Sequence, residues 1–207
     1  IAQMRDLGAE IIDCALPSAK HAVPAYYLLA TSEAASNLAR YDGVHYGLRS
    51  VRADASKQSN IDTTTQSRSE GFGAEVQLRI LLGTFASSYG YSAQFYERAR
   101  LARRAMQHEF AALFERCDFL LSPTSPTAAP RFGESEEDPL ARYLWDALTV
   151  PASLAGIPAL SMPCGPTADG RPVGLQAMAK HNHDGQLLQL AHVLQSQSRH
   201  HLRRPQL

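Results

Sequence analysis

Arg79 combines a permanent positive charge with a position on the predicted buried face of a helix. The residues of this face recur at helical spacing in the order Phe72, Val76, Arg79 and Gly83. A guanidinium group does not lose its proton in proteins, so a buried one needs an anionic partner. A structural ion pair, or a side chain that snorkels to water, would meet that need. A pocket that binds a carboxylate would meet it too, and the spacing leaves both interpretations open.

Asp146 and Tyr26 are two further candidates, each with an ordinary structural alternative. Asp146 follows the single tryptophan of the chain, on a helix predicted over residues 139–154. A lone aspartate in such a place usually caps a helix or joins a salt bridge. Tyr26 begins a helix predicted over residues 25–38, where Pro24 fits the N1 position. Neighbouring tyrosines usually pack in a core or an interface, and contact with a ligand is the alternative.

Motifs of several other enzyme classes are missing from the sequence. It has no Gly-x-Ser-x-Gly elbow, no P-loop, no Gly-x-Gly-x-x-Gly and no His-Glu-x-x-His. The histidine pairs lack a third ligand at a supporting spacing, so we expect no metal site. These pairs are His181 with His183 and His200 with His201.

Composition indicates a globular protein. Over 207 residues the hydrophobic fraction is 44% and the charged fraction 19%, which suits a folded chain with a sizeable core. The formal net charge of +0 favours neither nucleic-acid nor membrane binding. No run approaches the roughly 18 apolar residues that would span a membrane. Cys14, Cys117 and Cys164 form no Cys-x-x-Cys pair, which is typical of reduced thiols in a cytosolic protein.

Helices and short strands must position the candidate residues. We predict helices over residues 25–38, 92–116, 139–154 and 184–197, a helix that contains Arg79 and ends near residues 83–88, and strands over 117–121, 159–163 and 173–179. Asp169-Gly170 predicts a hairpin turn between the last two strands. Residues 122–127, SPTSPT, predict a rigid loop at a strand's carboxyl end, where ligands tend to bind in open α/β sheets. Residues 51–66 are polar without apolar periodicity and predict an exposed loop.

Two stretches carry a family resemblance: residues 68–84, RSEGFGAEVQLRILLGT, and residues 36–43, SNLARYDG. They closely resemble the amidase-signature family and, within it, the A subunits of glutamyl-tRNA(Gln) and aspartyl-tRNA(Asn) amidotransferases. The resemblance runs from about residue 15 to residue 197. It implies an α/β fold, part of the family's αβα layered architecture with a mixed sheet flanked by helices. Residues 1–198 would form the C-terminal part of a single domain, and residues 199–207 a polar, basic tail.

The resemblance implies a Ser–cis-Ser–Lys mechanism, in which a lysine acts through a bridging serine and a second serine attacks the amide carbonyl. The family carries these groups in its N-terminal half. The only lysines here are Lys20, Lys57 and Lys180, and there is no run like Gly-Gly-Ser-Ser-Gly. We therefore expect no catalytic residue in this chain and no activity from it alone.

The resemblance places recognition of glutamine in this half of the protein. Glutamine carries a carboxylate, which suits an arginine fork, and an ammonium group, which suits an aspartate. Matched to the family motifs, the substrate-binding arginine falls on Arg79, the aspartate on Asp146 and the tyrosine on Tyr26.

Arginines of the helix over 92–116 lie largely away from its apolar stripe, and such a face is usually solvated. Contact with tRNA or with another protein of the complex is the alternative.

The implied protein is the glutamine-hydrolysing component of a C–N ligase, an amidotransferase that acts in protein biosynthesis. Its B subunit would bind the misacylated tRNA and use ATP and Mg²⁺, and a small C subunit would complete a heterotrimer. This chain would hold no cofactor, would contact no membrane, and would work in the cytoplasm or in an organelle. A free-standing amidase is the nearest alternative, although a neutral amide offers no partners to Arg79 and Asp146. A non-catalytic scaffold is the second alternative function.

Overall fold

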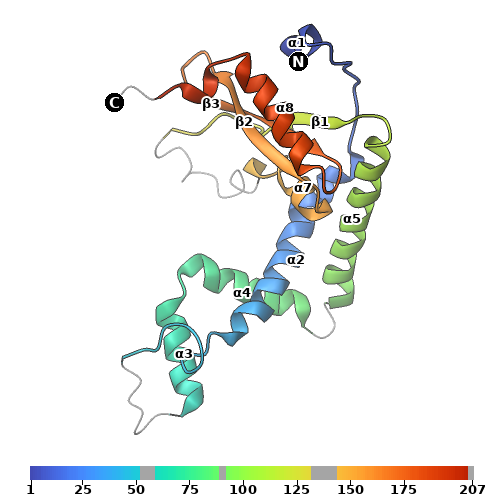
Figure 1. The fold of residues 1–207 in the computed structure, drawn as a ribbon. Coiled ribbons are helices and arrows are strands. Elements are labelled where there is room, and N and C mark those ends of the chain that lie inside the picture. The colour runs from blue at the N-terminus through green and yellow to red at the C-terminus, as the bar shows by residue number, and fades with distance from the viewer. Residues whose placement is uncertain (52–58, 89–91, 132–143, 205–207) are drawn as a thin grey trace. The chain divides into compact units, whose positions relative to one another are not determined.

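The computed structural model describes residues 1–51, 59–88, 92–131 and 144–204 (Figure 1). The chain forms two compact units. Unit 1 comprises Ile1–Val23 and Ala102–Leu207, and unit 2 comprises Pro24–Leu101. The single domain predicted over residues 1–198 remains a prediction.

Unit 1 is built around an antiparallel sheet with the strand order β1-β3-β2. The strands are β1 (Phe119–Pro123), β2 (Ala159–Pro166) and β3 (Pro172–Ala179). The predicted α/β class is confirmed. Mixed pairing, which the resemblance also implied, is not found among these three described strands. For β2 and β3 the physical reason is the tight turn at Gly170, where φ is +87°, because a connection this short can join only antiparallel strands.

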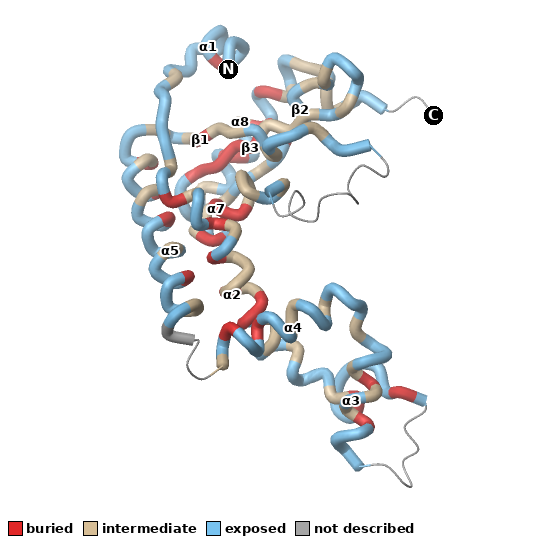
Figure 2. The backbone as a smooth tube through the Cα atoms, turned by 180° about the vertical axis from the view of Figure 1, so that it is seen from behind, coloured by how far each residue is buried: buried red, intermediate tan, exposed pale blue. Residues whose placement is uncertain are grey.

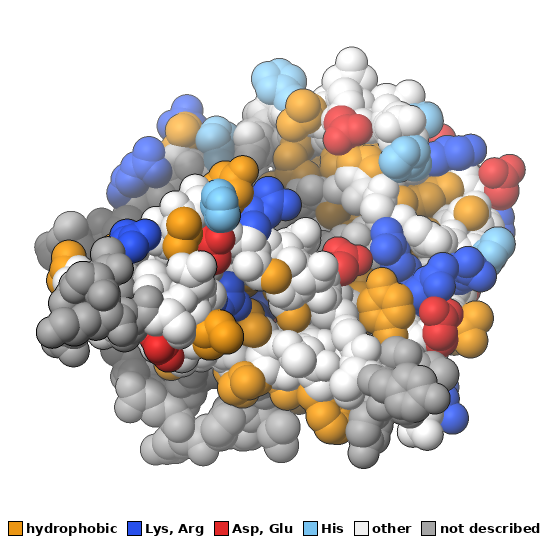
Figure 3. Space-filling view, turned by 90° about the horizontal axis from the view of Figure 1, so that it is seen from below, with side chains coloured by type: hydrophobic (Ala, Val, Ile, Leu, Met, Phe, Trp, Pro, Cys, Tyr) orange, Lys and Arg blue, Asp and Glu red, His pale blue; other side chains and the backbone are white. Residues whose placement is uncertain are grey.

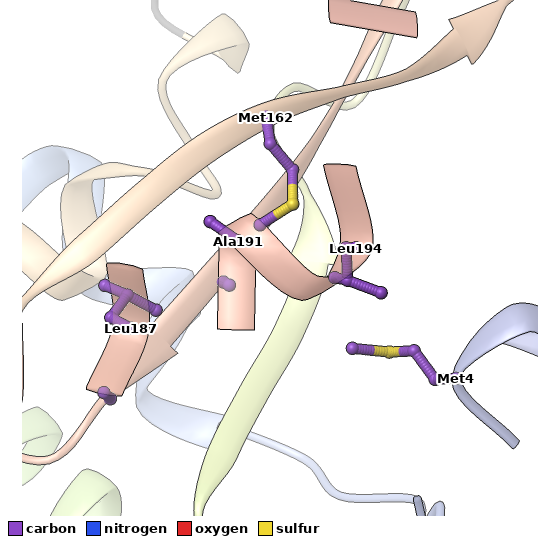
Figure 4. Packing of buried hydrophobic residues seen from close by; sticks show 7 residues of the cluster. Met4, Met162, Leu187, Ala191 and Leu194 are labelled. Atoms are coloured by element: carbon purple, nitrogen blue, oxygen red, sulfur yellow. The ribbon is translucent and has the colours of Figure 1, made fainter. Parts of the chain in front are cut away.

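Alternating side chains give this sheet two unlike faces. One face packs against α8 (Asp184–Ser196), with Met162 of β2 lying close to Ala191 (Figure 4). Met4 of α1 (Ala2–Asp6) lies beside Leu194 at the end of the same cluster. The buried residues of this cluster are Met4, Met162, Ala177, Ala179, Leu187, Ala191 and Leu194.

The opposite face is apolar at one end and polar at the other. Leu120 and Met178 pack with Phe110 of α5 (Ser92–Leu113), with Phe114 in the turn that follows α5, and with Ala152 of α7 (Val150–Ala155). Further along the same face, the paired residues Ser122, Gln176 and Ser161 form a polar row across the three strands. Figure 2 shows the buried stretches of β3 and α5 in red.

Helix α5 holds its neighbours through polar side chains. Glu109 accepts hydrogen bonds from the amide and hydroxyl of Ser18 in η1 (Pro17–His21), at 3.0 and 2.6 Å. Arg103 Nε donates to the Leu154 carbonyl at 2.8 Å, and Gln107 donates to the Ala155 carbonyl at 3.3 Å. Arg103 and Gln107 therefore bind the last two backbone carbonyls of α7. The solvated or tRNA-binding role of the arginine face of α5 stays a prediction.

Three other features of unit 1 differ from the sequence prediction. Within residues 139–154, Leu144 and Trp145 are helical, a turn over 146–149 that contains Asp146 interrupts the predicted helix, and α7 follows; residues 132–143 are outside the described residues. β1 continues through Ser122 and Pro123, which we predicted to be loop. The predicted tail contains a 3-10 helix, η4 (His200–Leu202), and a methyl group at Gly165 would lie 3.5 Å from the His200 ring.

Unit 2 contains α2 (Ala22–Asn37) from Pro24 onward, η2 (Leu38–Arg40), α3 (Asn60–Gly71), α4 (Ala74–Ser87) and the first part of α5, up to Leu101. The inward face predicted for α4 is confirmed, since Gly83 is buried and Val76 and Arg79 are half-buried. The predicted loop over 51–66 is wrong from residue 60 onward, where α3 begins; residues 52–58 are outside the described residues. Ser59 caps α3, because its hydroxyl accepts from the Asp62 amide at 3.2 Å and donates to the Asp62 carboxylate at 2.8 Å.

Two findings concern the surface. Among the described residues, none of the helices is both long and apolar enough to cross a membrane. On the face drawn in Figure 3, Lys and Arg side chains stand among acidic and hydrophobic ones. This mixture agrees with the formal net charge of +0.

Candidate functional site

A cavity of about 570 Å³ opens on the polar part of the sheet in unit 1. It is lined by β2 and β3, by the loop that follows β1, and by residues 145, 146 and 149 before α7. Its polar lining residues include Thr124, Ser125, Thr127, Asp146, Thr149 and Ser161. The predicted loop over residues 122–127 therefore lines a cavity from Thr124 onward.

Asp146 presents a carboxylate at this cavity. The residue is exposed, and among the described residues no hydrogen bond or ion pair reaches its side chain. Its backbone carbonyl accepts from the amides of Thr149 and Val150, at 3.1 and 2.9 Å, which joins the turn to the first residue of α7. The turn that carries the carboxylate is thus hydrogen-bonded to the start of α7, and the exposed carboxylate is open to a cationic group in the cavity.

A pair of hydroxyl groups and a glycine lie together in the cavity lining. Thr124 Oγ1 and Ser161 Oγ are 2.7 Å apart. A methyl group at Gly174 would lie 2.7 Å from the first oxygen and 2.9 Å from the second. Any side chain at residue 174 would therefore displace both hydroxyls and fill part of the cavity.

Gln176 lies beneath this polar region, and the sequence analysis did not single it out. Only 3% of the residue is exposed. Its Nε2 donates to Ser122 Oγ at 3.0 Å and to the Leu148 carbonyl at 2.8 Å. The signal was present in the sequence: the strand VGLQAMA has one amide among apolar residues, and a buried amide needs hydrogen-bond partners.

Arg79 lies in unit 2 between an acid and two tyrosines. Its Nε donates to Glu75 Oε1 at 2.8 Å, and its Nη1 donates to the Tyr26 hydroxyl at 3.3 Å. The guanidinium carbon lies 6.0 Å from the centre of the Tyr27 ring, within the range of a cation–π contact. The hydrogen bond to Tyr26 and then the pairing with Glu75 raise the pKa of Arg79 further above its ordinary value.

The contact with Glu75 does not use the whole guanidinium group. The Arg79 side chain is 34% exposed and that of Glu75 is 67% exposed, so this pair is worth only about 0.3–0.5 kcal/mol. Among the described residues no hydrogen bond to Nη2 of Arg79 is found. Nη2 and the second N–H of Nη1 can therefore still donate to a carboxylate.

The structure brings two of the three predicted residues together. Arg79 and Tyr26 are hydrogen-bonded within unit 2, and Asp146 belongs to unit 1. Tyr27, which the sequence could not separate from Tyr26, contacts Arg79 through its ring. In the described part of the chain, no group of three or more His, Cys, Asp or Glu side chains is arranged to hold a metal ion.

Comparison with known proteins assigns the family. The model of the amidase family matches residues 1–188, and the chain belongs to this family. The A subunit of glutamyl-tRNA(Gln) amidotransferase from Bacillus velezensis is 46% identical over 204 residues, which are 99% of this chain and 41% of that protein. The corresponding protein of Picosynechococcus is 44% identical over 207 residues, covering 100% of this chain and 42% of that protein. The chain thus spans about two fifths of the length of these relatives.

Solved structures agree with this assignment. The crystal structure of the glutamyl-tRNA(Gln) amidotransferase A subunit from Thermotoga maritima matches with a TM-score of 0.60 and 32% identity, over 88% of this chain and 34% of that one. A crystal structure described as an amidase matches with a TM-score of 0.69 and 26% identity, over 95% of this chain and 39% of that one. Both support the α/β architecture of the amidase family.

Proposed function

We propose that this chain is the C-terminal part of the glutamine-hydrolysing A subunit of a tRNA-dependent amidotransferase, and that it recognises glutamine. The observation that carries the proposal is the geometry of Arg79. Its Nη2 and the second N–H of Nη1 remain available beside the Tyr26 hydroxyl, while Nε is occupied by Glu75. The names and the 44–46% identity of the amidotransferase relatives support the choice of this branch of the family.

Each proposed contact follows from the charges of the substrate. Glutamine has a carboxylate, for which the planar fork of Arg79 supplies two parallel N–H donors. It also has an ammonium group, for which the exposed carboxylate of Asp146 supplies an acceptor. Tyr26 orients the guanidinium through its hydroxyl and adds a polar edge to the carboxylate end of the substrate.

The chemical step itself requires residues outside this chain. In the family mechanism a serine attacks the side-chain amide carbon of glutamine, and the C–N bond breaks to release ammonia. Water then attacks the acyl-enzyme and releases glutamate. A second subunit would bind the misacylated tRNA and use ATP with Mg²⁺, and a small third subunit would complete the heterotrimer. The assembly would act in the cytoplasm or in an organelle, to form Gln-tRNA(Gln) or Asn-tRNA(Asn).

The test compares two nitrogen sources in the full-length protein assembled with its partner subunits. Arg79→Lys replaces a planar fork by a point charge, so the KM for glutamine should rise by about 10-fold to 100-fold. The rate with free ammonia should stay unchanged, because ammonia bypasses the glutamine site. Arg98→Lys, at an exposed position of α5, is the matched control and should change neither rate. Equal loss with both nitrogen sources would contradict the proposal.

A second test separates this function from a free-standing amidase. The full-length protein should release ammonia from L-glutamine and should prefer it to neutral aryl or fatty amides. A preference for the neutral amides would favour the free-standing amidase. Absence of ammonia release from every amide, with the partner subunits present, would favour a non-catalytic scaffold.

A further inference from the structure

Gln176 connects three parts of unit 1 through one buried amide group. It belongs to β3, the central strand, and pairs in register with Ser122 of β1. Its Nε2 donates sideways to the Ser122 hydroxyl at 3.0 Å and to the Leu148 carbonyl at 2.8 Å. Leu148 lies in the turn before α7, so this second bond ties that turn to the sheet. With 3% of the residue exposed, water competes little for either bond.

The turn held by Gln176 is the one that carries Asp146. Leu148 comes two residues after Asp146, and the Asp146 carbonyl accepts the amides of Thr149 and Val150. The backbone from Asp146 to the start of α7 therefore forms one hydrogen-bonded piece. Ala152 attaches the far end of this piece to the apolar cluster with Phe110 and Met178. The bond from Gln176 is a second attachment, at the end where the carboxylate lies.

We propose that Gln176 is a positioning residue, which sets the place of the Asp146 carboxylate over the cavity and thereby the selectivity for substrates with an α-ammonium group. The proposal rests on the proposed function, because it takes Asp146 as the group that binds the ammonium. Gln176 itself does not contact the substrate in this account. It acts only through the Leu148 carbonyl and the turn that this carbonyl anchors.

The proposal makes a prediction that a purely structural amide does not. Loss of a structural hydrogen bond lowers stability and affects all substrates alike. Loss of the anchor for Asp146 weakens only the contact with the ammonium group. Two substrates separate these effects: L-glutamine, and glutaramic acid, which is glutamine without its α-amino group.

The experiment uses the full-length protein assembled with its partner subunits and measures ammonia release from both substrates. Gln176→Leu removes both donors and keeps a side chain of similar volume. We expect the preference for L-glutamine over glutaramic acid, expressed as a ratio of kcat/KM values, to fall by about 10-fold. The kcat/KM for glutaramic acid and the rate with free ammonia should stay near the wild-type values. Gln176→Met, which has a more adaptable side chain, is the second variant in case Gln176→Leu does not fold.

Two further variants make each outcome decisive. Glu109→Ala, which removes a hydrogen-bonded tie of unit 1 that is not part of the cavity lining, should lower the thermal midpoint and keep the substrate preference. Asp146→Asn should itself reduce the preference for L-glutamine. If Asp146→Asn leaves the preference unchanged, the proposed role of Asp146 fails, and the inference fails with it. Two other results would overturn only the inference about Gln176, provided that Asp146→Asn reduces the preference. In the first, Gln176→Leu keeps the wild-type preference. In the second, Gln176→Leu lowers kcat/KM equally for L-glutamine and for glutaramic acid.

Discussion

Gly83 of α4 lies so close to Thr31 of α2 that a methyl group at residue 83 would overlap the Thr31 carbonyl. The two helices therefore touch through their backbones at this point. Arg79 lies one turn before Gly83, on the same face of α4. The hydrogen bond between Arg79 and Tyr26 thus depends on how closely α4 approaches α2, and a glycine permits that approach.

Gly83→Ala should destabilise the protein, although alanine is the better helix former. The gain in helix propensity is about 1 kcal/mol, whereas overpacking against a backbone carbonyl costs about 1–3 kcal/mol or more. The thermal midpoint of the full-length protein should fall, and the KM for glutamine should rise as Arg79 moves away from Tyr26. Gly185→Ala in α8 is the matched control, because nothing lies within 4 Å of a methyl group there. That variant should be neutral or slightly stabilising, and a stabilised Gly83→Ala would contradict the backbone contact.

Tyr26→Phe tests the hydroxyl group that accepts the hydrogen bond from Arg79. The change removes the acceptor for Nη1 and keeps the ring, whose edge meets Tyr27 at 5.3 Å between ring centres. A hydrogen bond to a charged group contributes about 1.5–3 kcal/mol, so the KM for glutamine should rise by about 10-fold or more. Ammonia-dependent amidation should be unaffected. Tyr27→Phe, which keeps the ring face beneath Arg79, should have the smaller effect; the reverse order would assign the substrate-binding role to Tyr27.

Glu109→Ala tests the tie between η1 and α5. Two donors of Ser18 converge on one carboxylate oxygen, and Ser18 is 6% exposed. Their loss leaves a nearly buried amide without its partner, so we expect a destabilisation of about 1.5–3 kcal/mol in denaturant unfolding. Glu115→Ala is the control, because the ion pair of Glu115 with Lys180 is exposed and 3.6 Å long. That variant should change the free energy of unfolding by less than about 0.5 kcal/mol.

The loop after η2 should show a defined pH dependence. A hydrogen bond from the His45 ring, followed by those from the Val44 and His45 amides, holds the pKa of Asp42 well below its ordinary value. A lowered pKa in the folded state means that the unfolded chain binds the proton first as the pH falls. The stability contributed by ionised Asp42 is therefore complete above about pH 5 and declines at more acid pH. The wild-type thermal midpoint should exceed that of Asp42→Asn at neutral pH, and the difference should shrink below about pH 4; a difference that does not shrink in acid would contradict this account.

The sequence predicted those elements whose apolar residues keep a clear period. The inward face of α4 and the stripe on α5 were evident from spacing, and the Asp169-Gly170 turn predicted the hairpin of β2 and β3. Helix α3 was missed because its residues are polar and its stability begins with a local cap. The Ser59-x-x-Asp62 pattern is that cap, and it was readable without any apolar periodicity.

The candidate site was predictable where a single residue type restricts the chemistry. An arginine on an inward helical face predicted an anionic partner, and Glu75 occupies one edge of it. Gln176 was missed because its function depends on Leu148, which is distant in sequence and contributes only a backbone carbonyl. Spacing within a strand cannot indicate which carbonyl an amide will meet, since the fold alone brings the two together.

The alternation of β3 has a consequence for insertions and deletions. Ala177 and Ala179 point to the core beneath α8, whereas Gly174 and Gln176 point to the cavity side. A shift of the strand by one residue would exchange the two sets, placing an amide in the core and a branched apolar side chain, Val173 or Leu175, against the Thr124 and Ser161 hydroxyls. Both the core and the cavity therefore depend on the register of β3. Within the hairpin of β2 and β3, insertions and deletions should be tolerated only at the exposed tip around Asp169 and Gly170. A change of length there leaves the register of β3 intact, and with it the core and the cavity.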